Sequence, residues 1–254
     1  MRSTNPPTSA PIRRATAVTL LAGAAVVTLG VGTSSAAPSA ATKRKAFCAA
    51  AIDIDAIVGG PSNKAEGMAF AARFVPIAAT LSANAVPSLA PAMRTITAAF
   101  TKTAATGDPS ELEGPEFGKA VAKEEAWVYS NCGFQRVSVT AGDFKFTGIP
   151  ATLQTGNTSF KLRNTGKEFH MFIIMRRKDG ANDAVLDIFK SGEAATAAKL
   201  DEIGEMGLAP GTTTGLSSTL KPGRYVYVCP VKSGAKQEGP PHFMQGMYGE
   251  FTVA

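Results

Sequence analysis

Residues 223–229 read GRYVYVC and residues 242–253 read HFMQGMYGEFTV, near the C-terminal end of the chain. The first run alternates small, charged, aromatic and β-branched residues up to a cysteine, which predicts a β-strand that ends at Cys229. The second run begins with His242, reaches Met247 five residues later, and then predicts a closing strand. Three side chains with metal-binding atoms therefore lie around the ends of two successive strands.

The sequence upstream of these runs, from residue 135, has the pattern of a β-sandwich. The apolar run at 172–175 predicts a strand that is buried on both faces. Residues from about 183 to 207 have apolar positions at helical spacing, so we expect a helical insertion there. Strands joined by Gly/Pro turns predict an antiparallel β-sandwich over residues 135–254. Further alternating runs, which predict half-buried strands, occur at 137–140, 144–146 and 159–162.

Residues 43–134 have a different periodicity. Apolar residues recur three and four positions apart, as in the stripe from Met68 to Leu81, and Gly/Pro clusters interrupt the pattern. This pattern predicts a small bundle of three or four helices. The expected fold class is α+β, with an N-terminal all-α bundle followed by the β-sandwich. The bundle region contains no histidine and only scattered carboxylates, so the sequence assigns no role to it.

The first 36 residues have the composition of an export signal. Arg2, Arg13 and Arg14 give a positive start, no acidic residue precedes Asp53, and an apolar run leads to small residues near Ala36. We predict a signal peptide at 1–36 and a secreted or extracytoplasmic protein, in the cell envelope or periplasm, without a transmembrane span once the signal is removed. A retained membrane anchor is the alternative, and export by the Sec or the Tat route stays open.

The charge of the chain excludes one class of partner. The sequence has 26 basic and 20 acidic residues, and removal of the three arginines of the signal lowers the net charge from +6 to +3. The remaining basic residues form no block of the kind that binds nucleic acid. We therefore expect no nucleic-acid partner.

Export also affects the interpretation of the three cysteines, Cys48, Cys132 and Cys229. Outside the cytosol two of them can form a disulfide, and three pairings are formally open. The positions of Cys48 and Cys132 near the two ends of the helical region favour a bond between them. That pairing leaves Cys229 as a free thiol in an exported protein.

His170 and His242 are the only histidines of the chain, and both lie in the same half as Cys229. Two imidazoles, a thiolate and a weakly bound thioether make up the ligand set of a mononuclear electron-transfer copper site. We predict one type 1 copper ion held by His170, Cys229, His242 and Met247. Met244 is the competing axial ligand, and each of these side chains also has a simpler interpretation as a core or loop residue.

The sequence around these ligands resembles the cupredoxins, and the last thirty-odd residues resemble the plastocyanin-like members most. The resemblance covers residues 135–254 and rests on Leu220-x-Pro-Gly-x-Tyr-x-Tyr-x-Cys229, on Pro241-His242-x3-Gly-Met247, and on Asn164-Thr-Gly-x3-His170. It implies a cupredoxin-like β-sandwich, copper binding by the four predicted ligands, and electron exchange with a redox protein partner of unknown identity.

One stretch departs from the family pattern. Twelve residues separate Cys229 from His242, whereas the family usually has a few. A longer loop adds little closure entropy, about 0.6 kcal/mol for each doubling of its length. The insertion therefore bears on the rigidity of the copper site and on whether copper binds at all.

Three functions follow from these observations. The first is an electron carrier with one type 1 copper, the second a copper storage or delivery protein, and the third a metal-free binding module of the cell envelope. We expect no enzymatic activity, because the chain has no G-x-S-x-G or H-E-x-x-H motif, and two histidines are too few for a multicopper oxidase.

Overall fold

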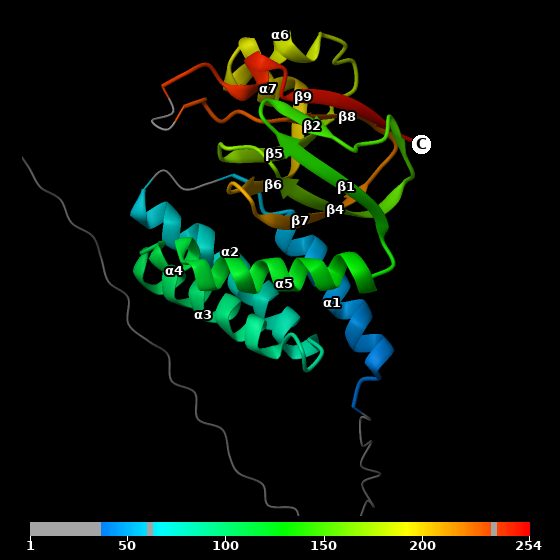
Figure 1. Ribbon diagram of the computed structural model, residues 1–254. Helices are drawn as coiled ribbons and strands as arrows, with labels where there is room; N and C mark the ends of the chain where they lie inside the picture. The colour runs from blue at the N-terminus through cyan, green and yellow to red at the C-terminus, as the bar shows by residue number, and fades with distance from the viewer. Residues whose placement is uncertain (1–36, 60–62, 235–237) are drawn as a thin grey trace, which may run out of the picture. The chain divides into compact units, whose positions relative to one another are not determined.

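The computed structural model describes residues 37–59, 63–234 and 238–254, so the predicted signal peptide at 1–36 lies outside the described residues. Residues Pro38–Ala254 form one compact unit, in which a layer of helices is followed by a two-sheet β-sandwich (Figure 1). The predicted α+β class is therefore confirmed. Within the described ranges, no helix has the length and apolar character that a membrane span requires.

Short-range sequence signals define the ends of several helices. The side chains of Ser39 and Asn63 accept hydrogen bonds from the first-turn amides of Thr42 and Glu66, which caps the first two helices. The third helix ends at Gly107, whose φ of 69° places it in the left-handed region that favours glycine. The helices are α1 (Ala40–Asp55), α2 (Lys64–Asn84), α3 (Ala90–Thr106), α4 (Ser110–Glu113) and α5 (Pro115–Asn131).

A disulfide joins the first and last of these helices. Cys48 lies on α1 and Cys132 directly follows α5, and their Cα atoms are 5.6 Å apart across a sequence separation of 84 residues. A bond that closes a loop of this size stabilises a fold by about 2–4 kcal/mol, mainly because it restricts the unfolded chain. The predicted pairing is therefore found in the structure, and Cys229 is a buried free thiol.

The sandwich consists of two sheets. In the first sheet the strand order is β2–β1–β4–β7, and in the second it is β3–β9–β8–β5–β6. The strands of the first sheet are β1 (Gln135–Gly142), β2 (Lys145–Thr147), β4 (Gly156–Asn164) and β7 (Thr213–Leu220). Those of the second are β3 (Thr152–Leu153), β5 (His170–Arg177), β6 (Leu200–Leu208), β8 (Gly223–Val228) and β9 (Tyr248–Val253).

The sandwich is mostly, but not wholly, antiparallel. β1 pairs with β4, and β3 with β9, in parallel register. The parallel β1–β4 pair arises because the chain turns back in β2 and crosses to the second sheet in β3 before β4 begins. The inner faces of both sheets enclose an apolar core that includes Phe160, Phe172 and Tyr225.

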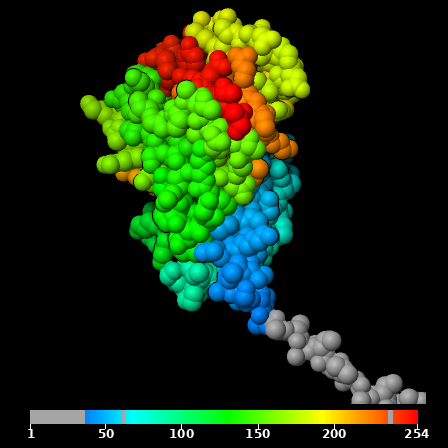
Figure 2. Space-filling view, turned by 90° about the vertical axis from the view of Figure 1, so that its right-hand side faces the viewer, coloured from blue at the N-terminus to red at the C-terminus, as the bar shows by residue number. Residues whose placement is uncertain are grey.

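The helical layer packs on the outer side of β7. The Ser217 amide donates to Asp55 Oδ2 of α1 at 2.7 Å, and the Gly215 amide donates to Glu125 Oε2 of α5 at 2.6 Å. A side chain at position 215 would come within 3.0 Å of Glu125 Cβ, so glycine allows this close approach. Figure 2 shows the helical part and the sandwich in direct contact.

The predicted helical insertion is only partly helical. Helices α6 (Val185–Lys190) and α7 (Glu193–Lys199) occupy its first part, but residues from Leu200 onward form strand β6, which pairs with β5. The prediction of helix up to residue 207 was wrong for this segment. The buried positions Leu200, Gly204 and Leu208 are four residues apart, a spacing that is compatible with a helix as well as with a strand.

Candidate metal centre

Three side chains with metal-binding atoms converge at one end of the sandwich. His170 begins β5, Cys229 directly follows β8, and His242 begins the short helix η1 (His242–Gln245) that leads into β9. β8 lies between β5 and β9 in the sheet, so these positions come from neighbouring chain segments. All three side chains are fully buried.

The donor atoms of these residues face one another at short distances. His170 Nδ1 lies 3.1 Å from His242 Nδ1, and Cys229 Sγ lies 3.3 Å from the same His242 nitrogen. Among the described residues, this is the group whose three ligand atoms all lie within 4.8 Å of one another. Metal–ligand bonds of about 2.0–2.3 Å separate neighbouring ligand atoms by somewhat more than 3 Å. The arrangement therefore fits a single metal ion.

Glu168 fixes the orientation of one imidazole. Its Oε2 lies 2.9 Å from His242 Nε2, and this carboxylate accepts the ring N–H. The hydrogen bond leaves a lone pair on Nδ1, the nitrogen that faces His170 and Cys229. His242 thus has the tautomer that a metal ligand requires.

His170 is held by close packing. Its Nε2 is buried and has no hydrogen-bond partner among the described residues. A Cβ on Gly166 would come within 3.0 Å of this nitrogen, so the glycine of the preceding turn makes room for the ring. The turn is tied to β6 by Asn164, whose Nδ2 donates to the carbonyls of Glu168 and Leu208 at 2.8 and 3.0 Å.

Burial disfavours the charged forms of His170 and Cys229. Burial, followed by the neighbouring His242, lowers the pKa of His170. Burial also raises the pKa of the Cys229 thiol, although hydrogen bonds from the Met171 and Val231 amides favour the thiolate. A metal ion must therefore displace the thiol proton, and metal affinity should increase with pH.

The structure separates the two candidate axial methionines. Met247 is fully buried and belongs to the same apolar core as Cys229, whereas Met244 is 46% exposed. The Cys229 amide donates to the Met247 carbonyl, and the Met247 amide donates to the His242 carbonyl, each at 3.0 Å. Met247 is therefore attached to both neighbouring ligands through the backbone, which supports its selection over Met244.

The long insertion between Cys229 and His242 is closed at its base. The His242 amide donates to the Val231 carbonyl at 2.8 Å, and the Phe243 amide donates to the Cys229 carbonyl at 3.0 Å. Lys232 and Pro241 form an isolated antiparallel bridge. The main chain beside Cys229 and His242 is therefore fixed by hydrogen bonds.

Sequence analysis singled out the three candidate ligands that the structure brings together, but it missed the residues that orient them. Glu168 also accepts from the Gly234 amide at 3.1 Å, so it joins the loop to His242. Phe144 packs edge-on against the His242 ring with centroids 4.9 Å apart. A carboxylate two positions before a predicted histidine ligand was the available signal for Glu168, but only the fold shows which histidine it contacts.

No protein-family profile and no curated protein sequence matches the chain. Among solved structures, it is similar to dithionite-reduced auracyanin from the photosynthetic bacterium Roseiflexus castenholzii, with 20% identity, 47% of this chain and 97% of that chain covered, and a TM-score of 0.33. It is similar to auracyanin A, a blue copper protein from Chloroflexus aurantiacus, with 16% identity and a TM-score of 0.29. This match covers 47% of this chain and 99% of that chain. The chain is also similar to reduced rusticyanin, with 22% identity and a TM-score of 0.30. This match covers 47% of this chain and 77% of that chain.

Proposed function

We propose that this protein is an extracytoplasmic, cupredoxin-like electron carrier that binds one type 1 copper ion. The observation that carries the proposal is the buried group of His170, Cys229 and His242, with its three donor atoms directed at one another. Two imidazoles and one thiolate bind copper in both oxidation states, and when bound the copper supplies the one-electron chemistry.

The chain's own residues would keep the site nearly unchanged during electron transfer. Glu168 holds His242, the packing against Gly166 holds His170, and the backbone around Cys229 is fixed by its hydrogen bonds to Met247 and Phe243. Met247 is the proposed axial ligand. Burial of all three strong ligands excludes water from them.

Electron exchange requires a surface at which a redox partner approaches the site. Phe169 and Met244 are the exposed large apolar side chains among the described residues, at 42% and 46% exposure. Phe169 directly precedes His170, and Met244 lies two residues after His242. We propose that a protein partner contacts the chain here, and we assign no enzymatic activity to the chain itself.

Cyclic voltammetry of protein loaded with one equivalent of copper distinguishes this function from copper storage or delivery. We expect one reversible Cu(II)/Cu(I) wave that persists in the presence of a Cu(I) chelator, because the ligands are buried and fixed in place. An irreversible wave with loss of copper to the chelator would support storage or delivery instead. Failure of the protein to bind copper at all would favour a metal-free binding module.

A further inference from the structure

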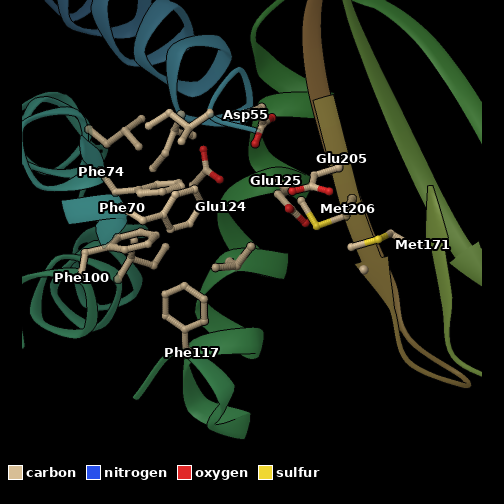
Figure 3. A pocket seen from close by; sticks show the side chains of 16 residues that line it. Asp55, Phe70, Phe74, Phe100, Phe117, Glu124, Glu125, Met171, Glu205 and Met206 are labelled. Atoms are coloured by element: carbon tan, nitrogen blue, oxygen red, sulfur yellow. The ribbon is translucent and has the colours of Figure 1, made fainter. Parts of the chain in front are cut away.

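A cavity of about 300 Å³ lies between the helical layer and β6, apart from the three predicted strong metal ligands. Phenylalanine side chains from α2, α3 and α5 form its helical side, and Met206 and Met171 lie on the strand side (Figure 3). A cavity of this size is at the lower end of the range for small-molecule sites in proteins. Its phenylalanines are Phe70, Phe74, Phe100 and Phe117.

Three carboxyl groups also line this apolar cavity, and two of them, Glu124 and Glu125, are buried. Asp55 comes from the end of α1, and Glu124 and Glu125 come from α5. Asp55 Oδ2 accepts from the Ser217 amide, and Glu125 Oε2 accepts from the Thr214 hydroxyl and the Gly215 amide. These bonds attach the helices to β7, but they use only one oxygen of each carboxyl group.

Two carboxyl oxygens at the cavity have no hydrogen-bond partner among the described residues. Oε1 of Glu124 and Oε1 of Glu125 are buried and accept no hydrogen bond from the described residues, although both side chains are more than nine-tenths buried. Figure 3 shows their carboxyl groups between the phenylalanine rings and the strand that carries Glu205 and Met206. An unsatisfied buried acceptor is costly, by about 1–3 kcal/mol for a neutral group and more for a charged one.

The lining supplies no positive charge to match these groups. The residues that line the cavity include Asp55, Glu124, Glu125 and Glu205 but no lysine, arginine or histidine. Burial raises the pKa of Asp55 to about 7. Burial and the neighbouring Asp55 raise the pKa of Glu124 to about 8, and burial with the neighbouring carboxyl groups raises the pKa of Glu125 well above its usual range. The charge of the cavity lining therefore favours a positively charged ligand.

We infer that this cavity binds a small organic ammonium ion, that is, an amine with a compact apolar or aromatic body. Its N–H groups would donate to the free Oε1 atoms of Glu124 and Glu125, and the carboxylates would balance its charge. The phenylalanine rings would enclose the body of the ligand and attract its cationic end through their faces.

Two other classes of ligand fit less well. A bare metal ion needs several ligand atoms close together, and the only group of histidine, cysteine or carboxylate ligands that meets this criterion in the described part of the chain is His170, Cys229 and His242. A neutral alcohol supplies a single O–H donor, which leaves one of the two free oxygens unpaired.

Isothermal titration calorimetry with matched probes tests the inference on the copper-free full protein, so that its outcome does not depend on the proposed copper site. The probes are 2-phenylethylamine and 2-phenylethanol, which share the aromatic body and differ in the charged group. We expect the amine to bind one-to-one and at least tenfold more tightly than the alcohol. Equal affinities, or no saturable binding of the amine, would overturn the inference.

Glu124→Gln locates the binding site. The Glu124 carboxyl group makes no hydrogen bond to the described residues, so the isosteric amide removes the ionisable group without removing a contact that holds the fold. The preference for the amine should fall at least tenfold in this variant and stay unchanged in Glu113→Gln, an exposed carboxyl of α4. An unchanged preference in a folded Glu124→Gln protein would exclude this cavity, and if that variant does not fold, the wild-type comparison of the two probes decides.

Discussion

Replacing Cys229 with serine is expected to abolish the intense visible absorption that we expect of the copper-loaded wild-type protein. The band arises from charge transfer between a thiolate and copper, and Cys229 is the only free cysteine among the described residues. Serine keeps the size of the side chain but supplies a hard hydroxyl that is not a comparable copper ligand. Titration of both proteins with Cu(II), followed by visible absorption, measures the effect.

Two further variants give this experiment its controls. Met244→Leu changes an exposed side chain near the site and should leave the band unchanged. Glu168→Gln keeps the three strong ligands but weakens the hydrogen bond to His242, so the band should remain while copper affinity falls about 10- to 100-fold. A Cys229→Ser protein that keeps the band would contradict the assignment of Cys229 as a ligand.

Replacing Glu124 with glutamine is expected to make the protein more stable at alkaline pH. Burial raises the pKa of Glu124 from 4.5 to about 8, and the neighbouring Asp55 adds to this shift. Between these two values the folded state binds a proton that the unfolded state has released, so the free energy of unfolding falls as pH rises. One such proton lowers stability by about 1.4 kcal/mol per pH unit.

Urea unfolding at pH 5, 7 and 9 measures this dependence. The stability contribution of Glu124 is fully present below pH 4.5 and is lost as pH rises through about 8, and glutamine has no proton to lose. The variant should therefore match the wild type near pH 5 and exceed it by several kcal/mol at pH 9. Asp55 and Glu125 line the same cavity and also have raised pKa values, so part of the fall in stability with pH remains in both proteins. Glu113→Gln is the exposed control, and parallel curves for Glu124→Gln and wild type would contradict the burial of an ionisable Glu124.

The sequence was most informative where function depends on rare residue types. The chain has two histidines and three cysteines, so few residues could be candidates for strong metal ligands. The alternating pattern of the strands around Cys229 and His242 predicted the sandwich. The Cys48–Cys132 bond was predicted from the expected export of the chain and from the positions of these cysteines at the ends of the helical region.

Long-range packing explains what the sequence did not reveal. Asp55 and Glu125 come from different helices and meet only because both accept hydrogen bonds from β7, so their carboxylates looked scattered along the chain. Strand β6 was taken for a helix because its buried residues are four apart, a spacing that a helix and a strand both allow. Neither feature has a local signal, since each depends on a partner that is distant in sequence.

Electron paramagnetic resonance of the wild-type protein with one equivalent of Cu(II) tests the central claim most directly. The proposed ligands Cys229, His170 and His242, with Met247 as a weak axial ligand, predict a single copper signal with the narrow hyperfine splitting of a covalent copper–thiolate site. A signal with wide splitting, typical of copper bound by nitrogen and oxygen in a tetragonal arrangement, would show that Cys229 does not bind the copper and would contradict the type 1 assignment.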